Sequence, residues 1–156
     1  MNLSGTFAFA GPRATVWALL HDPAVLAKAL PGTKTLTLAA PGRYEGAMKV
    51  SIGPLTAAEF AVVVTLSDEI EPSQFAMQID GKGGVGFARG SAAVTLQEQG
   101  DGGTAMDYTS DVQIGGRIAS VGQRLIESVS RMMMRQALEA LDRELRARID
   151  ADASGS

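Results

Sequence analysis

Few residues of this chain could do chemistry, because the usual reactive groups are scarce. The sequence holds one histidine, His21, and no cysteine, so it lacks a thiolate nucleophile and the ligand set of a typical zinc site. A lone histidine at the helix break His21-Asp22-Pro23 indicates a surface or capping group. No serine stands in a G-x-S-x-G motif, so a Ser-His-Asp triad is not supported. We expect no catalytic residue and no metal site.

The segment Gly81–Gly86 matches G-x-G-x-x-G, the spacing of the dinucleotide fingerprint. That fingerprint requires a helix directly after the loop, because the helix N-terminus holds the pyrophosphate. Residues 86–98 alternate in hydrophobicity instead, which predicts a strand. The glycines therefore indicate a hairpin with a bulge. The acidic cluster Asp68, Glu69 and Glu71 has too few oxygen ligands for a calcium loop and indicates a solvated turn.

Composition is that of an ordinary single domain. The chain has 156 residues, of which 46% are hydrophobic and 20% charged, and its net charge is −3. That charge argues against nucleic acid as the main partner. No apolar run approaches the roughly 20 residues of a membrane span, and no basic region precedes the short apolar stretch at the N-terminus, as it does in a signal peptide. We expect a cytoplasmic protein with one domain over residues 1–148 and a flexible tail over 149–156.

Hydrophobic periodicity and turn residues predict the order of the elements. A first strand, 3–10, is followed by two short helices, the second capped by Asp22 with Pro23 at its first position. Six strands follow, at 34–39, 42–53, 56–69, 74–81, 86–98 and 104–114. One long helix is expected over 117–148. The predicted fold class is α+β: a seven-stranded antiparallel sheet curved around a long C-terminal helix.

Several positions expected to face that helix are small: Gly46, Ala88, Gly90 and Ala92 on the strands, and Gly122 within the helix. Small residues on both sides allow either close packing of the helix on the sheet or an apolar cavity. The low aromatic content, 5%, favours a cavity, which is typically a ligand site. The expected ligand-binding residues are Trp17, Leu30, Tyr44, Met48, Phe60, Met77, Phe87, Gly90, Tyr108, Gly122, Leu125, Val129 and Met133.

Phe87 belongs to this set only if a bulge at Gly83-Gly84 turns it inward, because strict alternation points it outward. In the helix, at least one of Met132 and Met133 is expected to face the interior, with Met134 nearer the rim; flexible methionines suit a compliant ligand.

Arg117, Arg124 and Arg131 recur at seven-residue intervals on the opposite side of the helix, with Arg135 close by. Such a run is commonly a solvated face, although it could also contact anionic lipid or an acidic partner.

Four stretches resemble one family: DPAVLAKALPG (22–32), IGPLTAAEFAVVVTL (52–66), GFARGSAAVTL (86–96) and GTAMDYTSDVQIGGRIASVGQRLI (103–126). They resemble the CoxG-like family, named after the G subunit of carbon monoxide dehydrogenase, within the helix-grip (START/SRPBCC) superfamily. The resemblance covers nearly all of residues 1–145, and the last stretch is the most specific part.

The resemblance implies a helix-grip fold and a non-catalytic accessory protein. It implies a hydrophobic cavity that holds a lipid-like quinone, such as menaquinone, with no covalent cofactor. It also implies a molybdenum hydroxylase or carbon monoxide dehydrogenase as partner, and peripheral contact with the inner face of the cell membrane. Two departures bear on this: some members continue into a C-terminal membrane anchor, whereas this sequence stops at Ser156, and the family commonly has aromatic residues near Met132–Met134.

Two other functions remain open. The same fold includes polyketide cyclases and aromatases, but the inward faces offer only Tyr44, Tyr108 and Ser110 as polar groups, so an enzyme ranks lower. A recruitment or assembly factor with an empty cavity is the third alternative. Fold alone does not decide among them.

Overall fold

The computed structural model describes residues 1–155, which form one sheet with its helices on one side. The elements follow in the order β1 (Asn2–Phe9), α1 (Arg13–Leu20), α2 (Pro23–Ala29), β2 (Thr33–Ala40), β3 (Arg43–Ile52), β4 (Leu55–Ile70), β5 (Gln74–Gly83), β6 (Gly86–Glu98), β7 (Thr104–Gly115), the 3-10 helix η1 (Arg117–Val121) and α3 (Gln123–Gly155).

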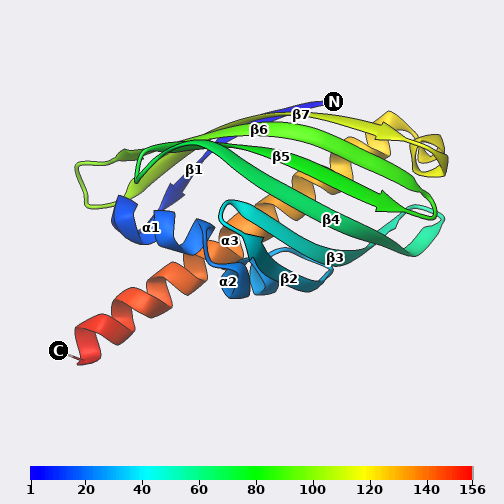
Figure 1. Cartoon of the computed structure of the whole chain (residues 1–156). Coiled ribbons are helices and arrows are strands. Elements are labelled where there is room, and N and C mark those ends of the chain that lie inside the picture. Colours follow the sequence, from blue (N-terminus) through cyan, green and yellow to red (C-terminus); the bar gives the residue numbers. More distant parts are fainter. Residues whose placement is uncertain (156) are drawn as a thin grey trace.

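The seven strands lie in the order β1-β7-β6-β5-β4-β3-β2, and all pairs are antiparallel. From β2 to β7 each strand pairs with the next along the chain, because short turns join them. β1 is the exception, since it pairs with β7 and places Gly5 opposite Tyr108. In Figure 1 the sheet curves over α3, which crosses beneath it. This arrangement confirms the α+β fold class and the helix-grip architecture.

The start of α2 shows how sequence directs this fold locally. The Asp22 carboxylate accepts hydrogen bonds from the backbone N–H groups of Ala24, at 3.0 Å, and Val25, at 3.4 Å. Pro23 occupies the first helical position, where its missing N–H costs nothing. The predicted cap is confirmed.

Apolar side chains gather in two separate clusters. The larger cluster lies where α1, α2 and the C-terminal part of α3 meet one end of the sheet, and consists of Phe9, Val16, Trp17, Leu19, Val25, Ala29, Phe75, Val94, Leu96, Met106, Leu138, Leu141 and Leu145. The smaller cluster lies at the other end, beside η1, and consists of Ile52, Ala58, Phe60 and Ile118. The fold is therefore anchored at both ends of the concave face.

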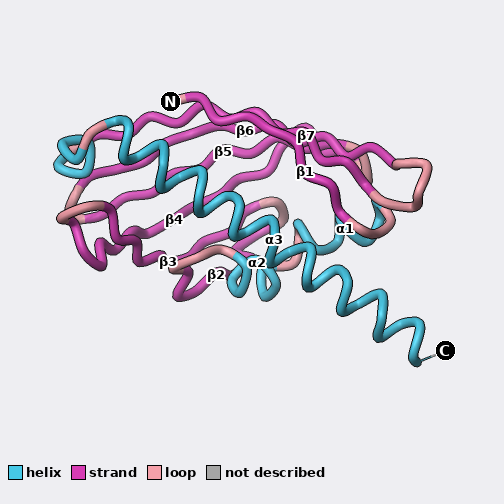
Figure 2. The backbone as a smooth tube through the Cα atoms, turned by 180° about the vertical axis from the view of Figure 1, so that it is seen from behind, coloured by secondary structure: helices cyan, strands magenta, loops and turns pink. Residues whose placement is uncertain are grey.

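α3 packs against α1, α2 and η1, and its closest approaches to the sheet are at β1 and β3, near opposite edges. Figure 2 shows the helix crossing the sheet diagonally, with its last turns extending beyond the sheet. The central strands thus make fewer close backbone contacts with the helix than β1 and β3 do. No helix in the described part of the chain combines the length and apolar character needed to cross a bilayer.

Every strand prediction agrees with the structure to within two residues. The prediction of one continuous helix over 117–148 is wrong at its start. Arg117–Val121 forms a 3-10 helix, and Gly122 separates it from α3 with a φ of 101°, a conformation that favours glycine. α3 then continues past residue 148 to Gly155. The flexible tail at 149–156 stays a prediction, and Ser156 lies outside the described residues.

Candidate functional site

The concave face of the sheet changes character between its ends and its middle. At the ends, inward side chains belong to the two buried clusters. In the middle they are apolar but only half-buried, namely Gly46, Met48, Val62, Val64, Met77, Ile79, Ala88, Gly90 and Ala92. These residues are neighbours across the strands: Val64 lies opposite Ile79, and Ile79 opposite Gly90. We call this contiguous, partly covered surface the concave strip.

A pocket of about 280 Å³ lies between β1 and α3. It is lined by Leu3, Thr6, Phe7, Tyr108, Arg131, Met134, Arg135 and Leu138. We call it the edge pocket. It lies beside the concave strip on the same face of the sheet. Leu3, in the pocket, is opposite Ser110, and Ser110 is opposite Ala92 of the strip. Its volume is just below the roughly 300–1,000 Å³ of pockets that enclose drug-sized ligands, so it suits a head group better than an entire long molecule.

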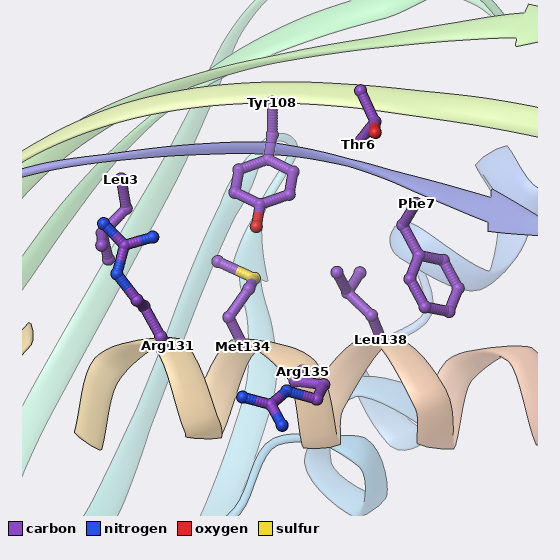
Figure 3. A pocket seen from close by; sticks show the side chains of 8 residues that line it. All are labelled: Leu3, Thr6, Phe7, Tyr108, Arg131, Met134, Arg135 and Leu138. Atoms are coloured by element: carbon purple, nitrogen blue, oxygen red, sulfur yellow. The ribbon is translucent and has the colours of Figure 1, made fainter. Parts of the chain in front are cut away.

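Tyr108 is the polar group best placed to meet a ligand there. Figure 3 shows its side chain reaching from β7 past β1, with the hydroxyl directed toward Met134 on α3. The ring lies so close to Gly5 that a Cβ at that position would come within 2.8 Å of the hydroxyl oxygen. Gly5 therefore allows the tyrosine to cross the edge strand and enter the pocket.

The other hydroxyl groups on the concave face are already occupied by backbone carbonyls. The hydroxyl of Thr104 donates to Gly11 O at 2.7 Å, that of Ser110 to Leu3 O at 2.9 Å, and that of Tyr44 to His21 O at 3.0 Å. Burial, together with the negative charges of Glu69 and Asp22, raises the pKa of the Tyr44 phenol above its ordinary value, which keeps it a neutral donor. Tyr108 makes no such bond within the described residues.

The remaining predicted site residues fall into three places. Met48, Met77 and Gly90 lie on the concave strip, and Phe60 and Val129 at the smaller cluster. Trp17 and Tyr44 are buried at the α1 end, Leu30 is half-buried at the end of α2, and Met133 is half-buried on α3. The structure thus gathers most of the set along one concave face, but not around one pocket.

Phe87 lies on the opposite, convex face. The guanidinium of Arg89 sits 4.9 Å from its ring centre, and Arg89 also pairs with Asp80 at 3.5 Å on that exposed surface. The expected bulge is missing, because β5 and β6 pair without a register shift from Gly83 and Gly86 onward. Strict alternation therefore holds, and including Phe87 in the site is wrong.

Gly122 is also misplaced by the sequence argument. It is exposed at the junction of η1 and α3, and a Cβ there would meet nothing within 4 Å. The glycine serves the positive φ of the junction rather than making room above the sheet. Leu125 is 36% exposed and touches the β3–β4 turn at Gly53, so it lies at the rim.

Gly46 has a further structural role. A Cβ at this position would clash with the carbonyl oxygen of Thr35. Its size therefore allows β2 to approach β3, and of the small residues predicted to make room, Ala88, Gly90 and Ala92 remain on the concave face.

Sequence reasoning missed most of the edge pocket. Leu3, Thr6 and Phe7 were not expected there because β1 is placed beside α3 only by its pairing with β7. Arg131 and Arg135 were assigned to the face opposite the apolar stripe. A usable signal existed in the helix: Arg131 and Arg135 are four residues apart, as are Met134 and Leu138, and the two pairs interleave on neighbouring positions of the helix surface.

His21 takes a structural role at the end of α1. Its ring stacks on Trp17 with centres 4.3 Å apart, Nδ1 lies 2.7 Å from Trp17 O, and Nε2 lies 2.8 Å from the Glu69 carboxylate. Both ring nitrogens therefore have partners, which matches the capping role expected from the sequence.

Between the two clusters the concave face of β3 to β7 carries no carboxylate, imidazole or amine. Along β3 to β7 its inward side chains are apolar apart from the hydroxyls of Tyr44, Thr104, Tyr108 and Ser110. The described residues also contain no group of three His, Cys, Asp or Glu able to hold a metal ion. The concave strip is therefore an apolar surface, whereas the edge pocket also has Arg131 and Arg135 in its lining.

Solved structures share this architecture. A conserved protein from Geobacillus kaustophilus aligns with a TM-score of 0.89 at 24% identity, over 94% of this chain and 96% of that one. A START superfamily protein from Mycobacterium smegmatis aligns at 0.72 and 14% identity, over 94% and 97%. The Zhui aromatase/cyclase from Streptomyces sp. R1128 aligns at 0.71 and 16% identity, over 96% and 95%. These likenesses establish the fold alone.

Comparison with curated proteins gives no significant match. The family model for CoxG, the G subunit of carbon monoxide dehydrogenase, in contrast, matches residues 5–146. That range begins within β1, at Gly5, and includes β2 to β7 and both short helices. It also includes the part of α3 that lines the edge pocket. The chain therefore belongs to the CoxG family of carbon monoxide dehydrogenase G subunits.

Proposed function

We propose that this protein is a non-catalytic carrier of a respiratory quinone, such as menaquinone, and that it links a carbon monoxide dehydrogenase or related molybdenum hydroxylase to the membrane electron-transport chain. Family membership and the START-like fold suggest a hydrophobic-ligand-binding accessory protein. The quinone, the partner enzyme and the link to electron transport are the proposed part.

The concave strip is the observation that carries the proposal. Its side chains are apolar and contiguous, yet they remain half-buried beneath α3, whereas the clusters at both ends are fully packed. Covering these side chains completely would stabilise the fold further, so a protein that needed only a stable core would be expected to bury them. An isoprenoid tail would cover it instead, and each buried CH₂ contributes about 0.8 kcal/mol.

The polar groups favour binding over catalysis. Of the hydroxyls on the concave face, only that of Tyr108 is free of a partner in the described chain, and no carboxylate or imidazole accompanies it. One donor can orient a quinone carbonyl. A cyclase or aromatase would more often pair such a hydroxyl with a carboxylate or an imidazole as general base.

Lipid extraction tests the carrier directly. Purified protein is extracted with organic solvent and the extract is analysed by mass spectrometry, and ligand-free protein is titrated with a short-tailed menaquinone. Near-stoichiometric quinone in the extract, or saturable one-to-one binding, supports the proposal. Absence of both overturns it and leaves the assembly factor with an empty cavity. Turnover of an aromatic polyketide substrate would instead favour the enzyme.

The partner and the membrane need separate tests. Affinity capture from cells that express a molybdenum hydroxylase should recover that enzyme with this protein. Sedimentation with vesicles of anionic phospholipid should show weak binding that salt reverses, since the four arginines Arg117, Arg124, Arg131 and Arg135 form no ion pair in the described residues. Failure of both would confine the proposal to ligand binding.

A further inference from the structure

The Tyr108 side chain crosses a neighbouring strand to reach the edge pocket. Gly5 of β1 lies directly opposite Tyr108 of β7, so the ring passes over a position that has no side chain. A Cβ at Gly5 would lie 2.8 Å from the hydroxyl oxygen, 3.1 Å from Cζ and 3.3 Å from Cε1 of that ring. In Figure 3 the hydroxyl points beyond β1, toward Met134 on α3. The glycine therefore determines where this hydroxyl lies.

A purely structural role accounts for the ring but not for its hydroxyl. An aromatic ring that covers a glycine of an edge strand stabilises the sheet, and phenylalanine would do this as well as tyrosine. The hydroxyls of Tyr44, Thr104 and Ser110 each donate to a backbone carbonyl, whereas that of Tyr108 makes no hydrogen bond within the described residues. Its donor is thus left for a molecule that enters the pocket.

Tyr108 is also less exposed than the other polar side chains of the pocket. Thr6, Arg131 and Arg135 are exposed, so a hydrogen bond from any of them to a ligand replaces one to water with little net gain. Tyr108 is half-buried and lies among the apolar side chains of the lining. Its hydroxyl is a neutral donor, which suits an uncharged acceptor such as a quinone carbonyl.

The geometry points to Tyr108 as the residue that selects the head group of the ligand, and to Gly5 as the residue that positions Tyr108. The head is neutral and carries a hydrogen-bond acceptor, and in the edge pocket the Tyr108 hydroxyl donates to that acceptor. This inference rests on the proposed carrier function and adds where the head binds and what recognises it. The pocket volume of about 280 Å³ leaves the tail to the adjoining concave strip.

A matched pair of ligands tests the role of Tyr108. One is a short-tailed menaquinone, and the other is the methylnaphthalene with the same tail, which lacks both carbonyl oxygens. In calorimetric titrations, Tyr108→Phe should weaken quinone binding about fivefold and change naphthalene binding by less than about twofold. The infrared carbonyl stretch of the bound quinone should move to higher frequency, because the hydrogen bond is lost. Equal losses for both ligands, or no loss for the quinone, would show that Tyr108 does not select the head.

Gly5→Ala tests the positioning role while it keeps the tyrosine. The new Cβ displaces the hydroxyl, so this variant should show the same selective loss of quinone affinity. Its unfolding temperature should stay close to that of wild type, because the φ of Gly5 is not positive and only the tip of a side chain has to move. Gly84→Ala is the matched control, since a Cβ there meets nothing within 4 Å, and it should bind both ligands as wild type does.

The double variant Gly5→Ala with Tyr108→Phe separates the two roles. Because both changes act through one hydroxyl, the double variant should lose no more quinone affinity than either single variant. Additive losses would show that Gly5 acts independently of Tyr108, and its positioning role would be wrong. Failure of the wild-type protein to bind either ligand overturns the carrier function itself, whereas binding of both without a selective loss in the variants overturns only the roles of Gly5 and Tyr108.

Discussion

The C-terminal half of α3, after Met134, is well packed: its apolar residues Ala137, Leu138, Leu141 and Leu145 are between 0% and 5% exposed. In the half that precedes it, Leu125 is 36% and Met132 is 46% exposed, and only Ile126 is buried. The C-terminal half packs into the larger cluster with α1 and α2. The N-terminal half spans the concave strip. The edge pocket lies where the two halves meet, since Arg131 and Met134 line it together with Arg135 and Leu138. One continuous helix thus fixes the fold with its C-terminal half and leaves the side chains of its N-terminal half more exposed.

The largest expected effect is in the packed half. Leu145→Ala removes a side chain that is 0% exposed and should lower the free energy of unfolding by about 2–5 kcal/mol. Urea denaturation followed by circular dichroism measures it. Met133→Ala is the matched truncation in the other half and should cost less than about 1 kcal/mol, because its site is already partly open. Equal costs would remove the distinction between the two halves.

A bulky residue on the concave strip should affect binding rather than stability. Ala92→Phe fills space beside Met77 and Ser110, so affinity for a short-tailed quinone should fall at least about tenfold, equivalent to about 1.4 kcal/mol. Fluorescence or calorimetric titration measures the change. Ala93→Phe places the same bulk on the exposed convex face and should leave affinity unchanged. Normal binding by the first variant would show that the ligand lies elsewhere.

The ion pair between Asp22, at the start of α2, and Arg148, in the packed half of α3, predicts that the stability of the fold depends on pH. Burial raises the pKa of the Asp22 carboxyl, but the Arg148 guanidinium, at 3.1 Å, and the N–H groups of Val25 and Ala24 outweigh it, so the net pKa lies below the ordinary 3.8. A lowered folded-state pKa adds stability above the unfolded value and loses it as pH falls through the folded one.

Asp22→Asn removes this charge and keeps a good cap. Wild type should therefore exceed the variant by up to about 1 kcal/mol at pH 7, and the gap should close as the pH falls below 3.8. Thermal unfolding across pH 2–7 follows it. A gap that stays constant with pH would mean that the Asp22 charge contributes nothing.

The smallest effects are expected from swaps that conserve volume. Met133→Leu in the open half should change stability by less than about 0.5 kcal/mol, whereas Leu138→Met in the packed half should cost about 1 kcal/mol. Denaturant midpoints resolve the two. If the first swap also sharpens ligand preference, the flexibility of the methionine is what makes the site permissive; an unchanged preference argues against that role.

Local patterns predicted the strands well because their determinants are local. Alternation identifies the faces of β3 to β7, and Gly or Pro residues mark the turns between them. Asp22 and Pro23 likewise begin α2 through contacts only two and three residues away. The sequence pattern did not predict the helix break at Gly122. Ile118 and Ile126 are both buried, so the apolar pattern continues unchanged from the 3-10 helix into α3.

The candidate site was predicted only in part, for a different reason. Tyr108 was placed correctly because its strand alternates regularly. Leu3 and Phe7 could not be connected with Arg131, since their proximity depends on β1 pairing with β7 across more than a hundred residues of chain. Whether a small residue permits close approach of a neighbouring strand, as at Gly46 and Gly90, or borders open space, as at Gly122, also depends on neighbours that only the folded chain supplies.

The edge pocket joins the first strand of the chain to its last helix, and that order has a consequence for synthesis. While the chain emerges from the ribosome, β2 to β6 can pair in sequence, but β1 must wait for β7 and then for α3. Contacts so distant in sequence form late. The pocket is therefore among the last features to form, because its walls come from the first strand and the last helix of the chain.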